Sequence, residues 1–117
     1  MAESRVPRGL YALTDPDLLP DDRIVDAVDQ ALVGGAAMIQ YRDKREDRAL
    51  KTGIAERLRD CCRRHARPLI INDDPELAHA VGADGVHLGL EDHDPLDARR
   101  LLGDNAIIGV TCHTSLE

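Results

Sequence analysis

The chain has almost no aromatic side chains. Tyr11 and Tyr41 are the only ones among 117 residues, and Phe and Trp are absent, so any core must be built from Leu, Ile, Val and Ala. It also lacks a basic excess, since 15 basic side chains face 22 acidic ones and the net charge is −7. Proteins that bind single-stranded nucleic acid need a basic groove and stacking rings. We therefore expect no nucleic-acid partner.

Long apolar runs and a cysteine framework are absent as well. A membrane span needs about 20 consecutive apolar residues, and none occurs here, so no membrane partner is expected. Residues 1–9 have no apolar signal segment, and we expect residues 1–8 to be a flexible N-terminus. The three cysteines, Cys61, Cys62 and Cys112, form neither an even set nor a CxxC pair. Sequence neighbours rarely form a disulfide, which predicts reduced thiols and a cytoplasmic location.

Five short apolar segments alternate with segments of helical period. We predict strands over residues 9–14, 37–41, 68–72, 85–88 and 106–110. The intervening helices are predicted over residues 24–32, 48–65, 75–81 and 95–102. Asp21 or Asp22 should cap the first helix, and Gly34 should end it. In the second helix, Arg and His neighbours suggest a polar face around Cys61 and Cys62, although helical spacing puts one of them on the apolar stripe.

The alternation of strands and helices is typical of the α/β class, and the nearly continuous apolar strands indicate a parallel sheet. Two architectures fit. One is an open doubly wound sheet, which the length favours. The other is a parallel (β/α) barrel of the TIM type, of which this chain would hold about the first five of eight strands in a single domain over residues 1–117. The polar residues favour the barrel, and in both folds the chemistry lies at the carboxyl ends of the strands.

Each predicted strand ends in ionisable or hydrogen-bonding side chains. In chain order they are Thr14 and Asp15; Gln40, Arg42 and Lys44; Asn72, Asp73 and Asp74; Glu91, Asp92 and His93; and Thr111, Cys112, His113 and Thr114. The second group is spaced two residues apart, so its side chains point the same way while the backbone is extended. Together the groups predict a polar mouth over an aliphatic sheet.

These residue types suit the binding of a diphosphate. Arg42 offers a planar fork for phosphate, and Lys44 adds a point charge. Asp73 and Asp92 follow adjacent strands and could share one Mg²⁺, which prefers one or two carboxylates together with substrate phosphates. A diphosphate held in this way is a leaving group whose developing charge is already neutralised.

Plainer interpretations stay open beside this one. Arg42, Asp43 and Lys44 are as well explained by a solvated charge cluster, and Asp74 is best explained as a helix cap. His65 and His79 should lie on helix surfaces. Cys112 and His113 point to opposite faces of a strand, which argues against a nucleophile pair. A zinc site around His93 lacks a second His or Cys at ligand spacing.

Four segments in order resemble the motifs of thiamine phosphate synthase. They are QYRDK (residues 40–44), IND (71–73), GADGVHLG (82–89) followed by Glu91 and Asp92, and IIGVT (107–111). The resemblance runs from about Tyr11 to the last residue. It implies a (β/α)8 barrel transferase that couples hydroxymethylpyrimidine diphosphate with thiazole phosphate, giving thiamine phosphate and pyrophosphate by dissociative transfer.

The resemblance also implies roles for individual residues. Catalytic roles fall on Arg42 and Lys44. Substrate-binding roles fall on these two residues together with Gln40, Asn72 and Thr111, which would bind the pyrimidine diphosphate. Asp73 and Asp92 match the two carboxylates that hold Mg²⁺, the implied cofactor. Leu90 departs from the family, which often has Gln at that position.

The family's later strands, with a Thr-rich loop, a further Lys and a glycine-rich phosphate loop, have no counterpart here. We therefore expect a truncated chain whose open sheet edges allow self-association. Two alternatives to the transferase remain open. One is a thiazole-phosphate isomerase relative, which the complete diphosphate and metal set disfavours. The other is a non-catalytic remnant that binds a diphosphate or a partner protein.

Overall fold

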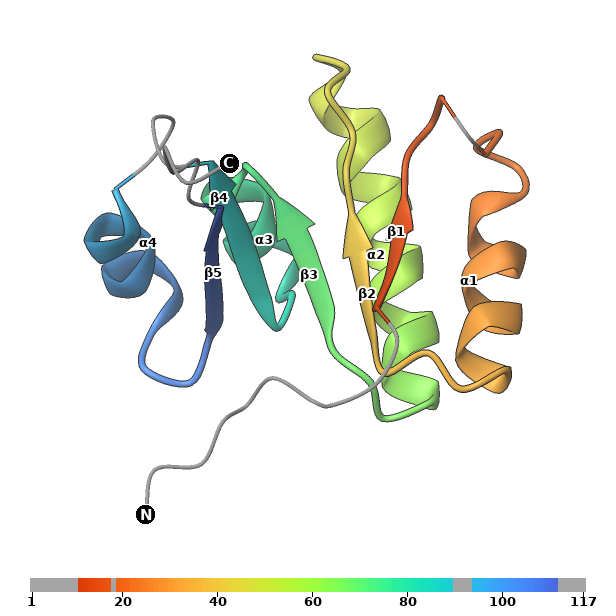
Figure 1. Ribbon diagram of the computed structural model, residues 1–117. Helices are drawn as coiled ribbons and strands as arrows, with labels where there is room; N and C mark the ends of the chain where they lie inside the picture. Colours follow the sequence, from red (N-terminus) through yellow and green to blue (C-terminus); the bar gives the residue numbers. More distant parts are fainter. Residues whose placement is uncertain (1–10, 18, 90–93, 112–117) are drawn as a thin grey trace, which may run out of the picture.

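A five-stranded parallel sheet backed by four helices forms the chain, as seen in a computed structural model that describes residues 11–17, 19–89 and 94–111 (Figure 1). Strands and helices alternate without exception, as the apolar pattern predicts. In order they are β1 (Tyr11–Thr14), α1 (Ile24–Val33), β2 (Met38–Tyr41), α2 (Arg48–Arg64), β3 (Leu69–Asn72), α3 (Pro75–Val81), β4 (Gly85–Gly89), α4 (Pro95–Leu102) and β5 (Ile107–Thr111).

The strands follow one another across the sheet in chain order. The order is β1-β2-β3-β4-β5, and every neighbouring pair is parallel. All four helices lie on one side of the sheet, behind it in Figure 1. A doubly wound sheet reverses its strand order and carries helices on both faces. The described part of the chain winds in one direction only, so the α/β class is confirmed and the open doubly wound alternative is not what forms.

The main core lies between the sheet and the helices. Alternate strand residues such as Ile39, Leu69 and Val86 point into it and are 0% exposed. From α2, a stripe at helical spacing packs onto them: Ile54, Leu58, Cys61 and Cys62. Because each strand alternates its side chains between faces, the remaining strand residues point to the opposite face, which the helices leave uncovered.

That uncovered face, called here the inner face, holds a much smaller apolar cluster of Met38, Ile70 and Ile107. Towards the β1 edge the inner face opens to solvent, and Tyr11 and Leu13 are each about half exposed (51% and 50%). The same face also carries the polar residues at the carboxyl ends of β2 and β3.

Three of the four described helices begin with an Asp side chain as N-cap, and one does not. The side chains of Asp47, Asp74 and Asp94 accept hydrogen bonds at the starts of α2, α3 and α4, so the predicted Asp74 cap is confirmed. The predicted cap of α1 is wrong, because the N-cap is Arg23, which makes no side-chain capping bond. The physical reason is that the Asp21 carboxylate is bonded to Arg45 instead.

The expected polar setting of the two α2 cysteines is wrong for Cys62, whereas the Cys61 thiol lies 3.8 Å from the Asp29 carboxylate. Cys61 and Cys62 are both buried and both free, because the apolar stripe of α2 is wide enough to take both. Burial raises the pKa of the Cys62 thiol to about 12, so this thiol stays protonated at neutral pH.

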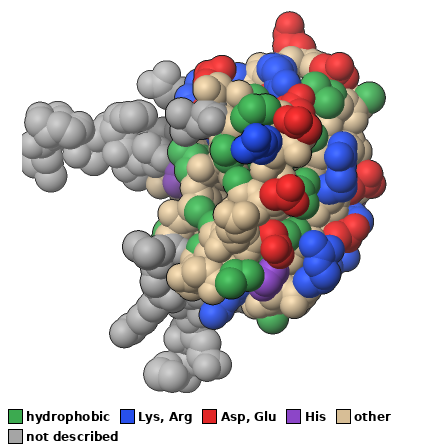
Figure 2. Space-filling model, turned by 90° about the vertical axis from the view of Figure 1, so that its right-hand side faces the viewer, with side chains coloured by type: hydrophobic (Ala, Val, Ile, Leu, Met, Phe, Trp, Pro, Cys, Tyr) green, Lys and Arg blue, Asp and Glu red, His purple; other side chains and the backbone are tan. Residues whose placement is uncertain are grey.

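Charged residues cover the outside of the helices. On the α1 side of the molecule, acidic and basic side chains are interspersed, with apolar groups scattered singly among them (Figure 2). Among the described helices, none is both long and apolar enough to cross a membrane.

Candidate diphosphate site

Gln40 and Asn72 lie on the inner face, near the carboxyl ends of β2 and β3. In register Gln40 stands beside Ile70, and Asn72 is two residues further along the same face of β3. Both side chains are half-buried. The main chain around Gln40 is held in place, since the Thr14 hydroxyl donates to the Gln40 carbonyl at 3.3 Å. The structure thus places two of the predicted amide side chains on one face.

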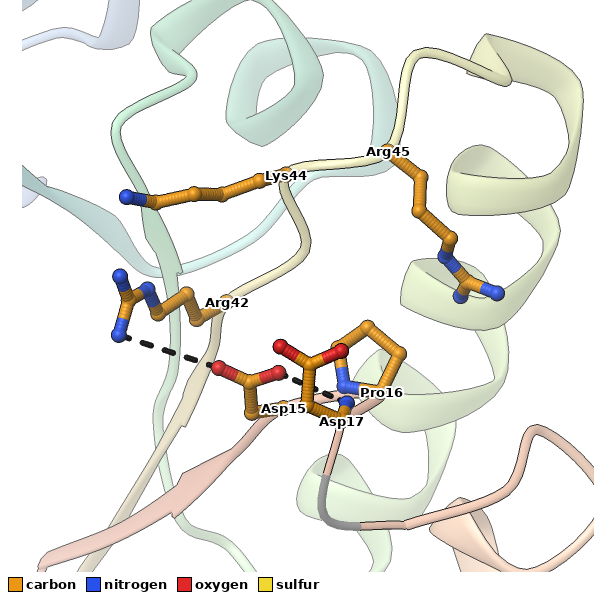
Figure 3. Close-up of a pocket in the computed structure, with 6 residues that line it drawn as sticks. All are labelled: Asp15, Pro16, Asp17, Arg42, Lys44 and Arg45. Atoms are coloured by element: carbon orange, nitrogen blue, oxygen red, sulfur yellow. Dashed lines mark hydrogen bonds and ion pairs between the residues drawn. The ribbon is translucent and has the colours of Figure 1, made fainter.

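Arg42 and Lys44 follow β2 and border a hollow of about 330 Å³ at this edge of the sheet. Its lining residues are Asp15, Pro16, Asp17, Arg42, Lys44 and Arg45. The Arg42 and Lys44 side chains point to the same side, whereas Arg45 points the opposite way (Figure 3). The predicted alternation therefore holds beyond the end of the strand, and two cationic groups share one side of the loop.

The Arg42 guanidinium faces a carboxylate across the hollow (Figure 3). Its Nη1 atom lies 3.8 Å from Oδ2 of Asp15, and the other Asp15 oxygen accepts from the Asp17 backbone N–H at 2.9 Å. At 3.8 Å this is a loose ion pair, well outside hydrogen-bond distance. An incoming phosphate could replace it with a shorter, forked pair.

Sequence reasoning missed a second set of residues in the same loop. Asp43 accepts from the Tyr41 hydroxyl at 2.6 Å and from the Arg45 guanidinium at 2.9 and 2.7 Å. Arg45 extends this network to Asp21 through two further bonds of 3.0 and 2.9 Å. Burial alone would raise the pKa of Asp43, but hydrogen bonds from Arg45 and Tyr41 hold it below its usual value. The signal was present in the sequence, because Tyr41, Asp43 and Arg45 share the alternation opposite to Gln40, Arg42 and Lys44.

Asp73 joins the ends of β3 and β4. Its backbone N–H donates to the His87 carbonyl at 2.7 Å, and its Oδ1 accepts from the Gly89 N–H at 2.8 Å. The Asn72 amide donates to its other oxygen at 3.2 Å. Asp73 has a φ of 60°, a left-handed conformation that few residues other than Gly adopt. The loop between β3 and α3 therefore holds this carboxylate in a defined place at the carboxyl edge.

Several predicted site residues lie outside the described residues. They are Leu90, Glu91, Asp92 and His93, together with Cys112, His113 and Thr114 and the predicted flexible residues 1–8. The backbone of Thr111 ends β5 in register with Gly89, which puts it at the same edge of the sheet as Asp73.

A further group of possible metal ligands lies away from this edge, between α1 and α2. The ligand atoms of Asp29, Cys61 and His65 lie within 4.8 Å of one another. Nε2 of His65 lies 2.7 Å from the Asp29 carboxylate, which makes His65 a half-buried helix-end residue rather than the surface residue predicted. His79 is exposed, as predicted.

Comparison with known proteins identifies the family. The family model described as thiamine monophosphate synthase matches residues 10–117. Thiamine-phosphate synthase from Marinobacter nauticus is 52% identical over 113 residues, covering 97% of this chain and 51% of the relative. The enzyme of the same name from Nitrosococcus oceani is 49% identical over 109 residues, covering 93% of this chain and 50% of the relative. The chain thus spans about half the length of these relatives.

Solved structures agree with the sequence comparison. Thiamine phosphate pyrophosphorylase from Pyrococcus furiosus superposes with a TM-score of 0.77 and is 38% identical, covering 86% of this chain and 48% of that one. An uncharacterised Bacillus cereus protein superposes with a TM-score of 0.60 at 17% identity, which shows a shared fold only. By sequence and by structure, this chain belongs to the thiamine monophosphate synthase family.

Proposed function

We propose that this chain carries the pyrimidine diphosphate subsite of a thiamine phosphate synthase. The reaction couples hydroxymethylpyrimidine diphosphate with thiazole phosphate and yields thiamine phosphate and pyrophosphate. One observation supports the proposal: Gln40 and Asn72 lie near the carboxyl ends of β2 and β3 on the face that the helices leave uncovered (Figure 1), and Arg42 and Lys44 border a hollow at the same edge of the sheet. Membership of the family supplies the reaction.

The basic residues give this subsite its affinity for the diphosphate. The Arg42 fork can bond two phosphate oxygens at once, and Lys44 is exposed and adds a mobile point charge. The side-chain amides of Gln40 and Asn72 can both donate and accept, so they suit a pyrimidine ring or its bridging oxygen. We place Thr111 at the same subsite because β5 ends beside Gly89.

The donor set at the edge of β3 fits Mg²⁺. Asp73 offers carboxylate oxygens, the hard ligands that Mg²⁺ prefers. Oδ1 accepts from the Gly89 N–H at 2.8 Å and Oδ2 from the Asn72 amide at 3.2 Å, and these bonds orient the carboxylate. We propose Asp73 and Asp92 as the protein ligands. When bound, the ion would neutralise charge that develops on the departing pyrophosphate.

In the proposed transfer, the bond between the pyrimidine methylene carbon and the diphosphate oxygen breaks, and its electron pair leaves with pyrophosphate. The carbocation is stabilised by the pyrimidine ring until the thiazole nitrogen attacks it. Arg42 and Lys44 bind the leaving group most tightly as its negative charge grows. No enzyme nucleophile is needed, in keeping with the buried Cys61 and Cys62, whose thiol pKa values are raised by burial.

We further propose that the sheet is the first part of a TIM-type (β/α) barrel. The one-directional strand order, the helices on a single face and the half-length match to the Pyrococcus furiosus structure support this assignment. The free, buried Cys61 and Cys62 support a reducing compartment, and we assign the protein to the cytoplasm.

The test is a calorimetric titration of this chain with hydroxymethylpyrimidine diphosphate, with and without Mg²⁺. We expect binding that depends on Mg²⁺ and that weakens by about 1.5–3 kcal/mol in Arg42→Ala, the worth of a charge-assisted contact. Asp73→Asn should remove the Mg²⁺ dependence, and Asn is chosen because it tolerates the left-handed backbone at this position. Arg100→Ala, on the exposed face of α4, is the matched control. Equal binding by the Arg42 and Arg100 variants would refute the assignment of Arg42.

A further inference from the structure

Residues 40–45 present two sets of side chains to two sides of the chain. Gln40 lies on the inner face, Arg42 and Lys44 border the hollow, and these are three of the proposed ligand-binding residues. Tyr41, Asp43 and Arg45 alternate with them. Arg45 points the other way in Figure 3, and hydrogen bonds through Asp43 join the three side chains. Tyr41 is fully buried in the core between sheet and helices, so the first residue of the second set is held in place by packing.

Asp43 is the centre of that second set. Only 1% of its side chain is exposed, and each of its oxygens accepts at least two hydrogen bonds. Oδ1 accepts from the backbone N–H of Arg45 at 3.0 Å and from its Nε at 2.9 Å, while Oδ2 accepts from the Tyr41 hydroxyl at 2.6 Å and from Arg45 Nη2 at 2.7 Å. A carboxylate bonded in this way is rigid, because every donor belongs to the core or to the loop itself.

Arg45 carries the constraint further, to the segment before α1. Nη1 and Nη2 donate to the two Asp21 oxygens at 3.0 and 2.9 Å, a forked pair that fixes the plane of the guanidinium. Asp21 therefore does not cap a helix, and α1 starts at Ile24 with no side-chain cap. A good capping residue is thus used to hold the loop after β2.

Arg42 and Lys44 lie on either side of Asp43, so their backbone is held at three points. The Arg42 N–H donates to the Thr14 carbonyl at 2.9 Å, Asp43 is bonded to Tyr41, and Arg45 is bonded to Asp21. A loop ordered before the ligand arrives does not lose that conformational entropy on binding. The two cations are therefore presented to the hollow by a loop that is already fixed.

We propose that Asp43 and Arg45 are positioning residues for the diphosphate subsite, acting through Arg42 and Lys44. Arg45 borders the hollow, but its guanidinium is bonded to Asp43 and Asp21. This inference rests on the proposed function and deepens it, because it names the residues that make the subsite preorganised. The chain from Tyr41 to Asp21 is the structural basis, and Arg45 is the member whose forked geometry Lys cannot reproduce.

The test uses Asp43→Asn, which keeps size and removes charge, with Asp97→Asn as the control at an exposed pair on α4. We expect affinity for hydroxymethylpyrimidine diphosphate with Mg²⁺ to fall about tenfold in the Asp43 variant and to stay unchanged in the control. Arg45→Lys should show a smaller loss than Asp43→Asn. Circular dichroism verifies that each variant is folded.

A double-mutant cycle separates positioning from general weakening of the structure. If Asp43 acts through Arg42, then Asp43→Asn should cost clearly less in an Arg42→Ala background than in the wild type. An equal cost in both backgrounds, or no cost in either, would overturn the inference while leaving the proposed function standing. Absence of binding by the wild-type chain would overturn the proposed function itself, and every variant would then behave alike.

Amide hydrogen exchange tests the loop without any ligand. The Arg42 and Arg45 amides, both bonded in the structure, should exchange faster in Asp43→Asn than in wild type, whereas the Asp97 control should match the wild type. Unchanged exchange at both amides would show that Asp43 does not order the loop, and the inference would be wrong whatever the binding data gave.

Discussion

The two faces of the sheet divide stability from function. The outer face packs against four helices and buries nearly all of the large aliphatic side chains. Among the described residues, the inner face has a small buried apolar cluster of Met38, Ile70 and Ile107, leaves Leu13 half exposed, and carries the polar groups of the proposed site. Because the strands alternate, one short sequence serves both faces, and neighbouring residues can have unrelated tasks. The difference predicts that removing the same side-chain atoms costs more stability in the core behind the outer face than on the inner face.

The largest effect is expected from removing a side chain in the main core. Leu58 is 0% exposed at the centre of the stripe on α2, and Leu58→Ala should lower the free energy of unfolding by about 2–5 kcal/mol through lost burial and a cavity. Leu13→Ala removes the same atoms from the inner face, where the side chain is half exposed, and should cost clearly less. Urea unfolding measures both, and equal losses would contradict the division between the faces.

A smaller loss of stability is expected from adding a methyl group where β4 and β5 lie close together. A Cβ at Gly85 would overlap the backbone carbonyl of Ile107 on the neighbouring strand, so Gly85→Ala should destabilise the chain by about 1–3 kcal/mol. Gly53→Ala is the matched control in α2, where the new methyl group meets only the end of Arg57 at 4.0 Å. That change should stabilise the helix by about 0.5–1 kcal/mol. A neutral Gly85→Ala would show that β4 and β5 can move apart.

The smallest effect concerns acid. Asp43 has a pKa held below its usual value of 3.8, so its contribution to stability is fully present above that pH and is lost as pH falls through the lower pKa of the folded state. Asp21 shifts in the same direction, because its side chain is hydrogen-bonded to Arg45. Unfolding curves from pH 7 down to pH 2 should therefore show a steeper loss of stability below pH 4 in wild type than in Asp43→Asn. Parallel curves would contradict this account.

Much of the fold could be predicted because its determinants are local. Apolar runs bounded by Gly and Pro mark the strands, and the helix over Pro75–Val81 follows from Asp74, Pro75 and Gly82, whose capping and turn preferences act within a few residues. The face of each strand residue follows from the period of two. Gln40, Arg42 and Lys44 could be grouped on this basis alone, and the structure places Arg42 and Lys44 on one side of the loop.

Other features depend on residues far apart in the chain. Asp21 looks like a helix cap until Arg45, 24 residues away, binds its carboxylate. Asp43 looks like one member of a solvated charge cluster until folding buries it beside the Tyr41 hydroxyl. The same holds for Cys61 and His65, which meet Asp29 across the contact between α1 and α2.

The class of fold, the order of the strands and helices, and the residue types at the carboxyl edge can be predicted from the amino-acid sequence alone, because periodicity and capping act between residues close in the chain. Three features depend on long-range contacts: the described helices cover one face (Figure 1), Asp43 and Arg45 hold the loop after β2, and Asp73 joins β3 to β4. These features depend on which side chains are buried against one another when the chain folds. Burial strengthens a charged hydrogen bond and penalises an unpaired charge. A short stretch of sequence does not reveal which distant residue will pair with a buried charge.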